Sequence, residues 1–289
     1  MKTRKLQLLA LGFVLTFMMA APAACAPTLT FKFRTIKVPG ALSTALGGIN
    51  NAGVMVGQYE AGKGTTRGFM QDGNKLTRID DPEGSQTVCK NINSTGAIVG
   101  NYEDSSGVMR GFLYQKGKFT DIPGPTGAIS SQANGINDSG LIVGAYSDST
   151  GTQHGFLLTG KKYKTLDVPG GFGTVATGIN NHGHIVLYWN DAEQNSESSL
   201  YNGKTYKTID VPGASNTLAE DLDNADDVVY QWFDSDLHPH GALLHAGKYY
   251  KFNHAKSMGT YGAGINDRSV VVGFFVPDSN SGGGFTATY

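Results

Sequence analysis

The stretch GINNAGVMVG, residues 48–57, returns with variations five more times along this chain. Its first Asn has equivalents at regular positions, namely Asn50, Asn93, Asn137, Asn180, Asp223 and Asn266. Successive equivalents are 43 or 44 residues apart. A fixed period of this length predicts a repeat protein, in which each unit is one supersecondary element. Six such units account for most of the 289 residues.

Each unit contains four short strand patterns separated by turn residues. In the second unit we predict strands at residues 87–93, 97–102, 109–115 and 118–121. The turn after the first strand, Asn93 to Gly96, has an Asn where a type I turn uses a side-chain acceptor and a Gly where φ is positive. Pairs such as Asn202-Gly203 favour a tight hairpin between the last two strands. Each unit therefore predicts a four-stranded antiparallel sheet.

Repeated sheets of this kind predict an all-β protein, a six-bladed β-propeller of four-stranded antiparallel blades. The sixth unit ends after its third strand, residues 284–289, while a spare strand precedes the first unit at residues 31–36. We expect this spare N-terminal strand to complete the sixth blade and to close the ring. An open β-solenoid is the alternative, but it does not account for the spare strand. Residues 26–289 are thus predicted to form one propeller domain.

Two apolar series recur in the second strands of the units. One consists of Val56, Val99, Val143, Val186, Val229 and Val272. An aromatic residue follows each Val three positions later, at Tyr59, Tyr102, Tyr146, Trp189, Trp232 and Phe275. A position that is apolar in every unit predicts packing between neighbouring blades.

The first 25 residues differ from the rest and predict an export signal. Lys2, Arg4 and Lys5 precede an apolar segment at residues 6–19, and small residues follow at 20–24. We expect a secreted, extracellular or periplasmic protein without a transmembrane segment in the mature chain. Cys25 follows the small residues directly, which leaves a lipid anchor open. Cys89 stands alone in the rest of the chain, so no disulfide framework is expected.

Charge excludes one class of partner. The formal net charge is -1 and only 16% of the residues are charged, so no basic surface is expected to hold a phosphate backbone. We predict no nucleic-acid partner, a monomer, and an extracellular ligand that is a carbohydrate or a protein.

Three recurring motifs resemble those of the bacterial extracellular HAF-type repeat family. They are the Gly-Ile-Asn stretch, His154-Gly155-Phe156, and the Thr-Ile-Asp-Val-Pro-Gly segment at residues 208–213. The resemblance covers nearly all of the predicted mature chain, although Gly stands in place of the family's central Ala. It implies an exported, propeller-like repeat protein. It implies no catalytic residue.

Units four and five depart most from the common pattern and are our candidates for the binding site. Leu187 and Tyr230 replace a Gly that the other four units share. The side chains of Tyr188, Trp189, Tyr230 and Trp232 could form stacking surfaces for a sugar. The alternative explanation is that these residues vary without a function, because the repeat accepts different residues at these positions.

Unit five also contains the alternation Asp234-x-Asp236-x-His238-x-His240. In an extended strand these four side chains would lie on one face and could hold a metal ion. A solvated loop explains the pattern equally, so we predict no metal and no cofactor. We include His238 and His240 among the candidate ligand-binding residues.

No catalytic motif is present: the chain lacks a Gly-x-Ser-x-Gly elbow, a His-Glu-x-x-His pair and a Gly-rich phosphate loop after a strand. We therefore predict a binding or interaction module and assign no catalytic residue. The alternative is an extracellular hydrolase or lyase that acts on a carbohydrate or lactone in the propeller channel. A tight polar cluster in the channel with perturbed protonation would favour the enzyme, whereas a broad aromatic and polar rim would favour the binding module. A purely structural surface protein is the third reading.

Overall fold

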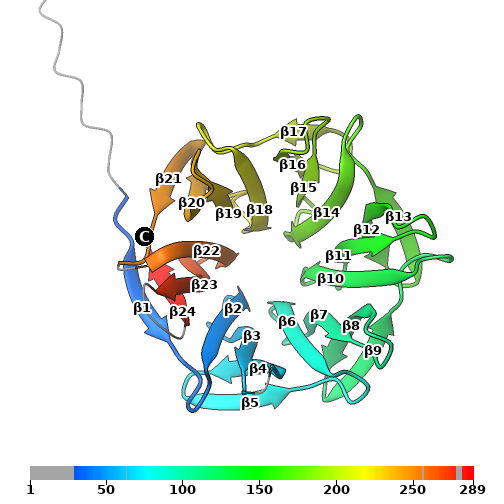
Figure 1. Cartoon of the computed structure of the whole chain (residues 1–289), viewed down its shortest axis with the longest axis horizontal. Coiled ribbons are helices and arrows are strands. Elements are labelled where there is room, and N and C mark those ends of the chain that lie inside the picture. Colours follow the sequence, from blue (N-terminus) through cyan, green and yellow to red (C-terminus); the bar gives the residue numbers. More distant parts are fainter. Residues whose placement is uncertain (1–28, 63, 256, 278–281) are drawn as a thin grey trace, which may run out of the picture.

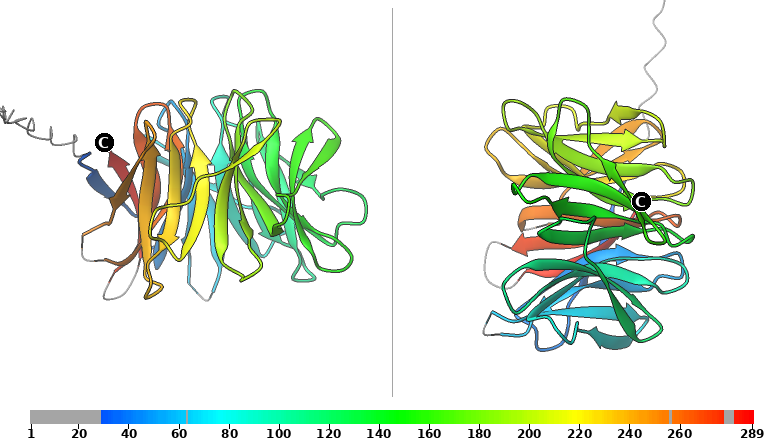
Figure 2. Two further views of the ribbon diagram at one scale, coloured as in Figure 1. Left: turned by 90° about the horizontal axis from the view of Figure 1, so that it is seen from above. Right: turned by 90° about the vertical axis from the view of Figure 1, so that its right-hand side faces the viewer.

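The computed structural model describes residues 29–62, 64–255, 257–277 and 282–289. These residues form six four-stranded antiparallel sheets around a central axis, with no helix among them (Figure 1). Seen from the side, the sheets stand next to one another as blades (Figure 2). The predicted six-bladed propeller is confirmed. The predicted export signal and Cys25 lie outside the described residues.

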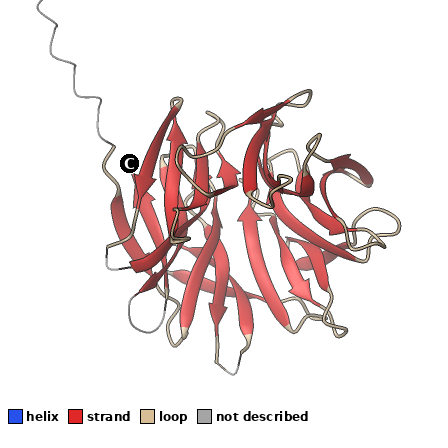
Figure 3. Cartoon of the chain, turned by 45° about the horizontal axis from the view of Figure 1, so that its top comes forward, coloured by secondary structure: helices blue, strands red, loops and turns tan. Residues whose placement is uncertain are grey.

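Strands joined by turns make up the described chain (Figure 3). The innermost, first strands of the blades are β2 (Ser43–Ile49), β6 (Gln86–Ile92), β10 (Ser130–Ile136), β14 (Phe172–Ile179), β18 (Asn216–Leu222) and β22 (Ser257–Asn266). The second strands are β3 (Met55–Glu60), β7 (Ile98–Glu103), β11 (Ile142–Ser147), β15 (Ile185–Asn190), β19 (Val228–Phe233) and β23 (Val270–Pro277). The third strands are β4 (Thr66–Asp72), β8 (Met109–Gln115), β12 (Gln153–Thr159), β16 (Ser196–Tyr201), β20 (Pro239–His245) and β24 (Gly283–Thr288). The outer, fourth strands are β5 (Lys75–Ile79), β9 (Lys118–Ile122), β13 (Lys162–Leu166), β17 (Tyr206–Thr208), β21 (Lys248–Phe252) and β1 (Lys32–Ile36).

The N-terminal strand β1 is the outer strand of the sixth blade and closes the ring. It pairs antiparallel with β24, with Lys32 opposite Thr288 and Ile36 opposite Gly284. The ring of Phe33 lies edge-on to Phe285 of the sixth blade, with 5.3 Å between the ring centroids. The predicted pairing between the two ends of the chain is confirmed.

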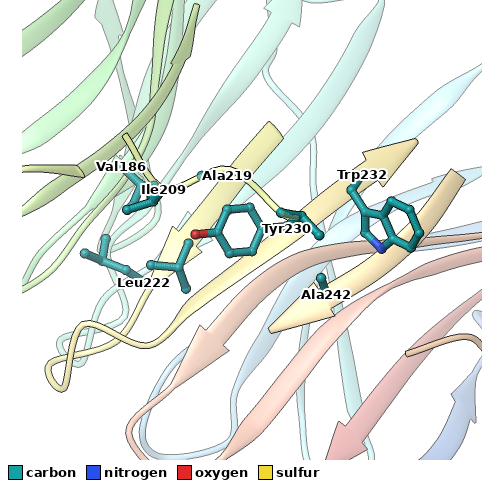
Figure 4. Packing of buried hydrophobic residues seen from close by; sticks show 9 residues of the cluster. Val186, Ile209, Ala219, Leu222, Tyr230, Trp232 and Ala242 are labelled. Atoms are coloured by element: carbon teal, nitrogen blue, oxygen red, sulfur yellow. The ribbon is translucent and has the colours of Figure 1, made fainter. Parts of the chain in front are cut away.

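The core lies between neighbouring blades, as the two recurring apolar series predict. All six Val residues of the first series are fully buried. One cluster joins Val186 of blade four to Leu222 and Val228 of blade five, and Tyr230 packs within it (Figure 4). Because each cluster of this kind crosses a boundary between blades, burial of the strand faces holds the ring together.

The repeated Asn turns lie together at one end of the channel. In blade three, Asn137 Oδ1 accepts hydrogen bonds from the backbone N–H groups of Ser139 (3.1 Å) and Leu141 (3.0 Å), as the predicted turn requires. Asn137 Nδ2 donates to the carbonyl of Asn180 in the next blade at 3.1 Å. The equivalent bonds join Asn50 to Asn93, Asn93 to Asn137, Asn180 to Asp223, and Asn266 to Asn50. We call Asn50, Asn93, Asn137, Asn180, Asp223 and Asn266 the Asn ring.

The Asn ring makes five of the six links between neighbouring blades, because a carboxylate at position 223 has no N–H to donate to the next blade. A second set of bonds runs beside it. The backbone N–H of Asp138 donates to Asn181 Oδ1, and that of Asn181 donates to Asn224 Oδ1, each at 2.9 Å. The motif that defines the repeat thus shapes its own turn and also joins one blade to the next.

Candidate functional site

A cavity of about 290 Å³ lies in the channel between the innermost strands. In every blade, the pairing of the first strand with the second skips the residue two positions before the recurring Ile or Leu; β14 and β22 have a further irregularity nearer their start. A bulge of this kind leaves its extra residue outside the ladder. The six skipped residues, which we call the bulge positions, are Gly47, Lys90, Asn134, Thr177, Glu220 and Ala263. All six line this channel cavity.

Polar amides and two aromatic rings complete the wall of the channel cavity. Gln58, Gln132 and Gln231 come from blades one, three and five. Tyr188 and Phe274 come from the second strands of blades four and six. Tyr261 stacks on Phe274 with 4.4 Å between ring centroids, which holds the Phe274 ring in place. The wall therefore combines hydrogen-bonding groups with apolar ring surface.

A polar contact across the channel separates the channel cavity from the Asn ring. The residue after the bulge position is Gly in four blades, but it is Asn91 in blade two and Asp221 in blade five. Asn91 Nδ2 donates to Asp221 Oδ2 at 3.2 Å, and the same oxygen accepts from the backbone N–H of Ile265 at 3.3 Å. A smaller cavity of about 70 Å³, lined by the Asn ring and by the apolar residues beside it, lies beyond this contact.

Lys90 and Glu220 are the two charged residues that line the channel cavity among the described residues, and they belong to opposite blades, two and five. Burial raises the pKa of Glu220 to about 7, and the positive charge of Lys90 opposes this rise. Burial also raises the pKa of Asp221 to about 7, against the hydrogen bond from Ile265. A carboxyl of this kind can exchange a proton near neutral pH.

Of the predicted aromatic residues, only Tyr188 lines the channel cavity. The ring of Tyr230 is fully buried between blades (Figure 4). Trp232 is 6% exposed, and its Nε1 donates to the carbonyl of Gly241 at 3.1 Å. The predicted stacking surface at Tyr230 is therefore wrong, because that ring is part of the core and offers no face to a ligand.

Trp189 and the two histidines lie outside the channel cavity. Trp189 packs against the core between blades three and four, and its Nε1 donates to Ser199 Oγ at 3.2 Å. His240 stacks on Trp232, with 4.5 Å between centroids, and its Nε2 lies 3.1 Å from Asp234 Oδ2. His238 is exposed and lies directly before strand β20. Ligand binding by Trp189, Trp232, His238 and His240 stays a prediction.

The alternation from Asp234 to His240 does not form an extended strand. Asp234 Oδ1 accepts hydrogen bonds from the backbone N–H groups of Asp236 and His238, each at 2.9 Å, so residues 234–238 form a turn. Ligand atoms of Asp234, Asp236 and His238 still lie within 4.8 Å of one another. The structure therefore favours the solvated loop over four side chains on one face of an extended strand, because strand β20 begins only at Pro239.

The sequence interpretation identified neither Lys90 nor Glu220 as a candidate site residue. One sequence signal could have identified both. The bulge positions carry six different residue types, whereas the Ile or Leu and the Asn or Asp that follow two and three positions later hardly vary. A position that varies inside an otherwise constant motif is a candidate for chemistry that the common fold does not need.

No helix among the described residues is long and apolar enough to cross a membrane. No protein-family model matches the chain, and no curated protein matches it either. The resemblance to HAF-type repeats therefore stays a prediction.

Solved structures do resemble this chain. The fucose-specific lectin of Aleuria aurantia, a six-bladed β-propeller, has a TM-score of 0.53 and 13% identity, covering 88% of this chain and 93% of that chain. AofleA of Arthrobotrys oligospora has a TM-score of 0.56 and 12% identity, with 88% and 84% covered. The β-propeller domain of the Trilobed protease of Pyrococcus furiosus has a TM-score of 0.50 and 10% identity, with 84% and 95% covered. At such identities the likeness concerns the fold alone, which is that of a six-bladed β-propeller.

Proposed function

We propose that this protein is an exported carbohydrate-binding module and that its ligand occupies the channel cavity. The observation that carries the proposal is the composition of the wall, which combines side-chain amides from four blades with the rings of Tyr188 and Phe274. Amide groups both donate and accept hydrogen bonds, as sugar hydroxyls do, and an aromatic face covers the apolar side of a sugar ring. The volume lies near the lower end of the ~300–1,000 Å³ typical of small-molecule sites.

Solved structures with the same fold support carbohydrates as the first class of ligand to test. They include a fucose-specific lectin and SapL1 lectin in complex with α-methyl fucoside. The ligand of this chain is not inferred to be fucose, because the shared identity is low. Export rests on the sequence of residues 1–25 alone.

A sugar screen by thermal shift, followed by calorimetry on each hit, tests the proposal. Gln132→Ala should weaken a hit about threefold to tenfold, since one net hydrogen bond contributes about 0.5–1.5 kcal/mol. Gln153→Ala is the matched control, because Gln153 lies in the same blade but outside the channel cavity. A hit that Gln132→Ala leaves unchanged would place the ligand elsewhere and contradict the proposal.

The channel also supports the enzymatic alternative, a hydrolase or lyase, through one specific observation. Glu220 faces the cavity with its pKa raised by burial to about 7, which suits a general base. Under this alternative, Glu220→Gln should lower turnover about 100-fold or more while affinity changes little. Product analysis after incubation with each sugar that binds separates the two functions, since a binding module returns the ligand intact.

A further inference from the structure

Lys90 differs from the other lysines among the described residues in being partly buried, since each of the others is exposed. Lys164 Nζ donates to Tyr201 Oη at 2.7 Å, and Lys251 Nζ lies 3.7 Å from the centroid of the Trp232 ring. Among the described residues, Lys90 Nζ has no hydrogen-bond or ion-pair partner, although it lies near enough to Glu220 for the two charges to interact. An ammonium group that lines a cavity without a paired anion is suited to an anionic ligand.

Glu220 is the other charged group of the channel cavity. Its surroundings set its protonation state, and this state sets the net charge of the cavity. Burial and the charge of Lys90 from blade two set the pKa of Glu220, while Tyr188 from blade four also lines the cavity and Asp221 follows Glu220 in the chain. Because burial weakens the acidity of both carboxyls, they are partly protonated near neutral pH. In that state Lys90 gives the cavity a positive charge, and the Glu220 carboxyl can donate a hydrogen bond to a hydroxyl.

We infer that the channel cavity selects an acidic sugar of the uronic acid class. The sugar carboxylate pairs with Lys90 Nζ, and the hydroxyls bond to Glu220 and to the amides of Gln132 and Asn134. This inference rests on the proposed carbohydrate-binding function and names the chemical class of its ligand. Lys90 is a specificity-determining residue under this assignment.

The test compares sugars that differ only in the group at carbon 6. Calorimetry would use three such pairs, glucose with glucuronate, galactose with galacturonate, and mannose with mannuronate. Glucosamine, which carries an ammonium group at carbon 2, serves as a cationic comparison outside these pairs. In at least one pair the acid should bind about tenfold more tightly than the neutral sugar, which corresponds to about 1.4 kcal/mol. Lys90→Gln should remove this preference and Lys90→Arg should keep it.

The matched control is Lys118→Gln, which makes the same charge change at an exposed position of β9 outside the cavity. It should leave the preference unchanged. Thermal melting of each variant checks that the fold is intact. Since Lys90 is only partly buried and has no partner, we expect Lys90→Gln to melt as the parent protein does.

Binding should also depend on pH in a defined direction. As the pH falls from about 8.5 to about 6, the carboxyl of Glu220 takes up a proton while a uronate, like other carboxylates, stays ionised. Repulsion between the two carboxylates then disappears, so uronate affinity should rise. In Glu220→Gln this pH dependence should become smaller.

The outcomes separate this inference from the function on which it rests. A neutral sugar that binds as well as its acid, or a stronger response to glucosamine, would overturn the inference and leave the carbohydrate-binding proposal standing. Acid preference that survives Lys90→Gln would also overturn it. If folded protein binds no sugar of either kind, the carbohydrate-binding proposal itself fails.

Discussion

The two ends of the central channel differ in what the six blades contribute. At the Asn ring, five of the six blades carry an Asn, and blade five carries an Asp. The bulge positions, in contrast, carry six different residue types. Each Asn of the ring bonds within its own turn and to the next blade, so a substitution there disturbs two blades. The residue at a bulge position stands outside the strand ladder and lines the channel cavity, although Asn134 and Thr177 also donate hydrogen bonds to backbone carbonyls of the next blade. The nearly constant residues of the Asn ring make contacts that build this propeller. The variable residues at the bulge positions lie where a binding site can be specific.

The largest effect should follow from removing the strand that closes the ring, because both ends of the central channel depend on the closed ring. Deleting residues 31–36 should lower the free energy of unfolding by about 3–6 kcal/mol, because Phe31 and Phe33 each contribute about 1.5–3 kcal/mol by burial. Urea unfolding measures this loss. Arg34→Ala, an exposed change within the same strand, is the control and should have little effect. An unchanged unfolding midpoint for the deletion would show that β1 does not hold the ring closed.

A pair of substitutions in blade three compares the two ends directly. Asn137→Ala removes three hydrogen bonds at a buried position and should cost about 2–4 kcal/mol. Gln132→Ala, in the wall of the channel cavity, should cost less than about 0.5 kcal/mol while it weakens ligand binding. Chemical denaturation of the two variants gives both values. Equal costs would contradict the division between a constant end and a variable end.

The missing link of the Asn ring can be restored. Asp223→Asn supplies an N–H that can donate to the carbonyl of Asn266, and it should raise the free energy of unfolding by about 1 kcal/mol. The gain should depend on pH. Burial raises the pKa of Asp223 from its ordinary value of 3.8 to about 6. The stability that its protonated form contributes is fully present below 3.8 and is lost as the pH rises through about 6.

Asp223→Asn should therefore stabilise the protein more at about pH 8 than at about pH 4.5, because only at the higher pH does the parent carry a buried, ionised carboxylate. Thermal melting of parent and variant at the two pH values measures the difference. A gain that is the same at both values would mean that Asp223 does not titrate in this range.

The smallest effect is expected at a bulge position. Ala263→Ser should change the free energy of unfolding by less than about 0.5 kcal/mol, because the side chain faces the cavity. Ile265→Ala, two residues further along the same strand and buried, should cost about 2–4 kcal/mol. Denaturation curves of the two variants give both free energies, and a loss above about 1 kcal/mol for Ala263→Ser would contradict the difference between constant and variable positions.

Sequence patterns predicted the strands well because their signals are local. The predicted strand at residues 109–115 coincides with β8, and the predicted strand at residues 97–102 lies one residue before β7. Prediction of the site was less successful, for a physical reason. Tyr230 and Tyr188 are both aromatic residues of second strands, yet the first is core and the second lines the channel cavity. Residue type does not tell these two environments apart, because the side a residue faces depends on strand pairing.

The number of blades, the order of their strands and the closure by β1 could all be predicted before the fold was known, since each follows from repeat spacing and from one unpaired strand pattern. Only the tertiary structure brought Asn91 to Asp221, residues 130 positions apart, and placed Lys90 and Glu220 around one cavity. These contacts depend on a bulge in each innermost strand and on closure of the ring, which sets blades two and five opposite each other. Neither is a local property of the chain, so no short segment of the sequence could have shown where the charged groups meet.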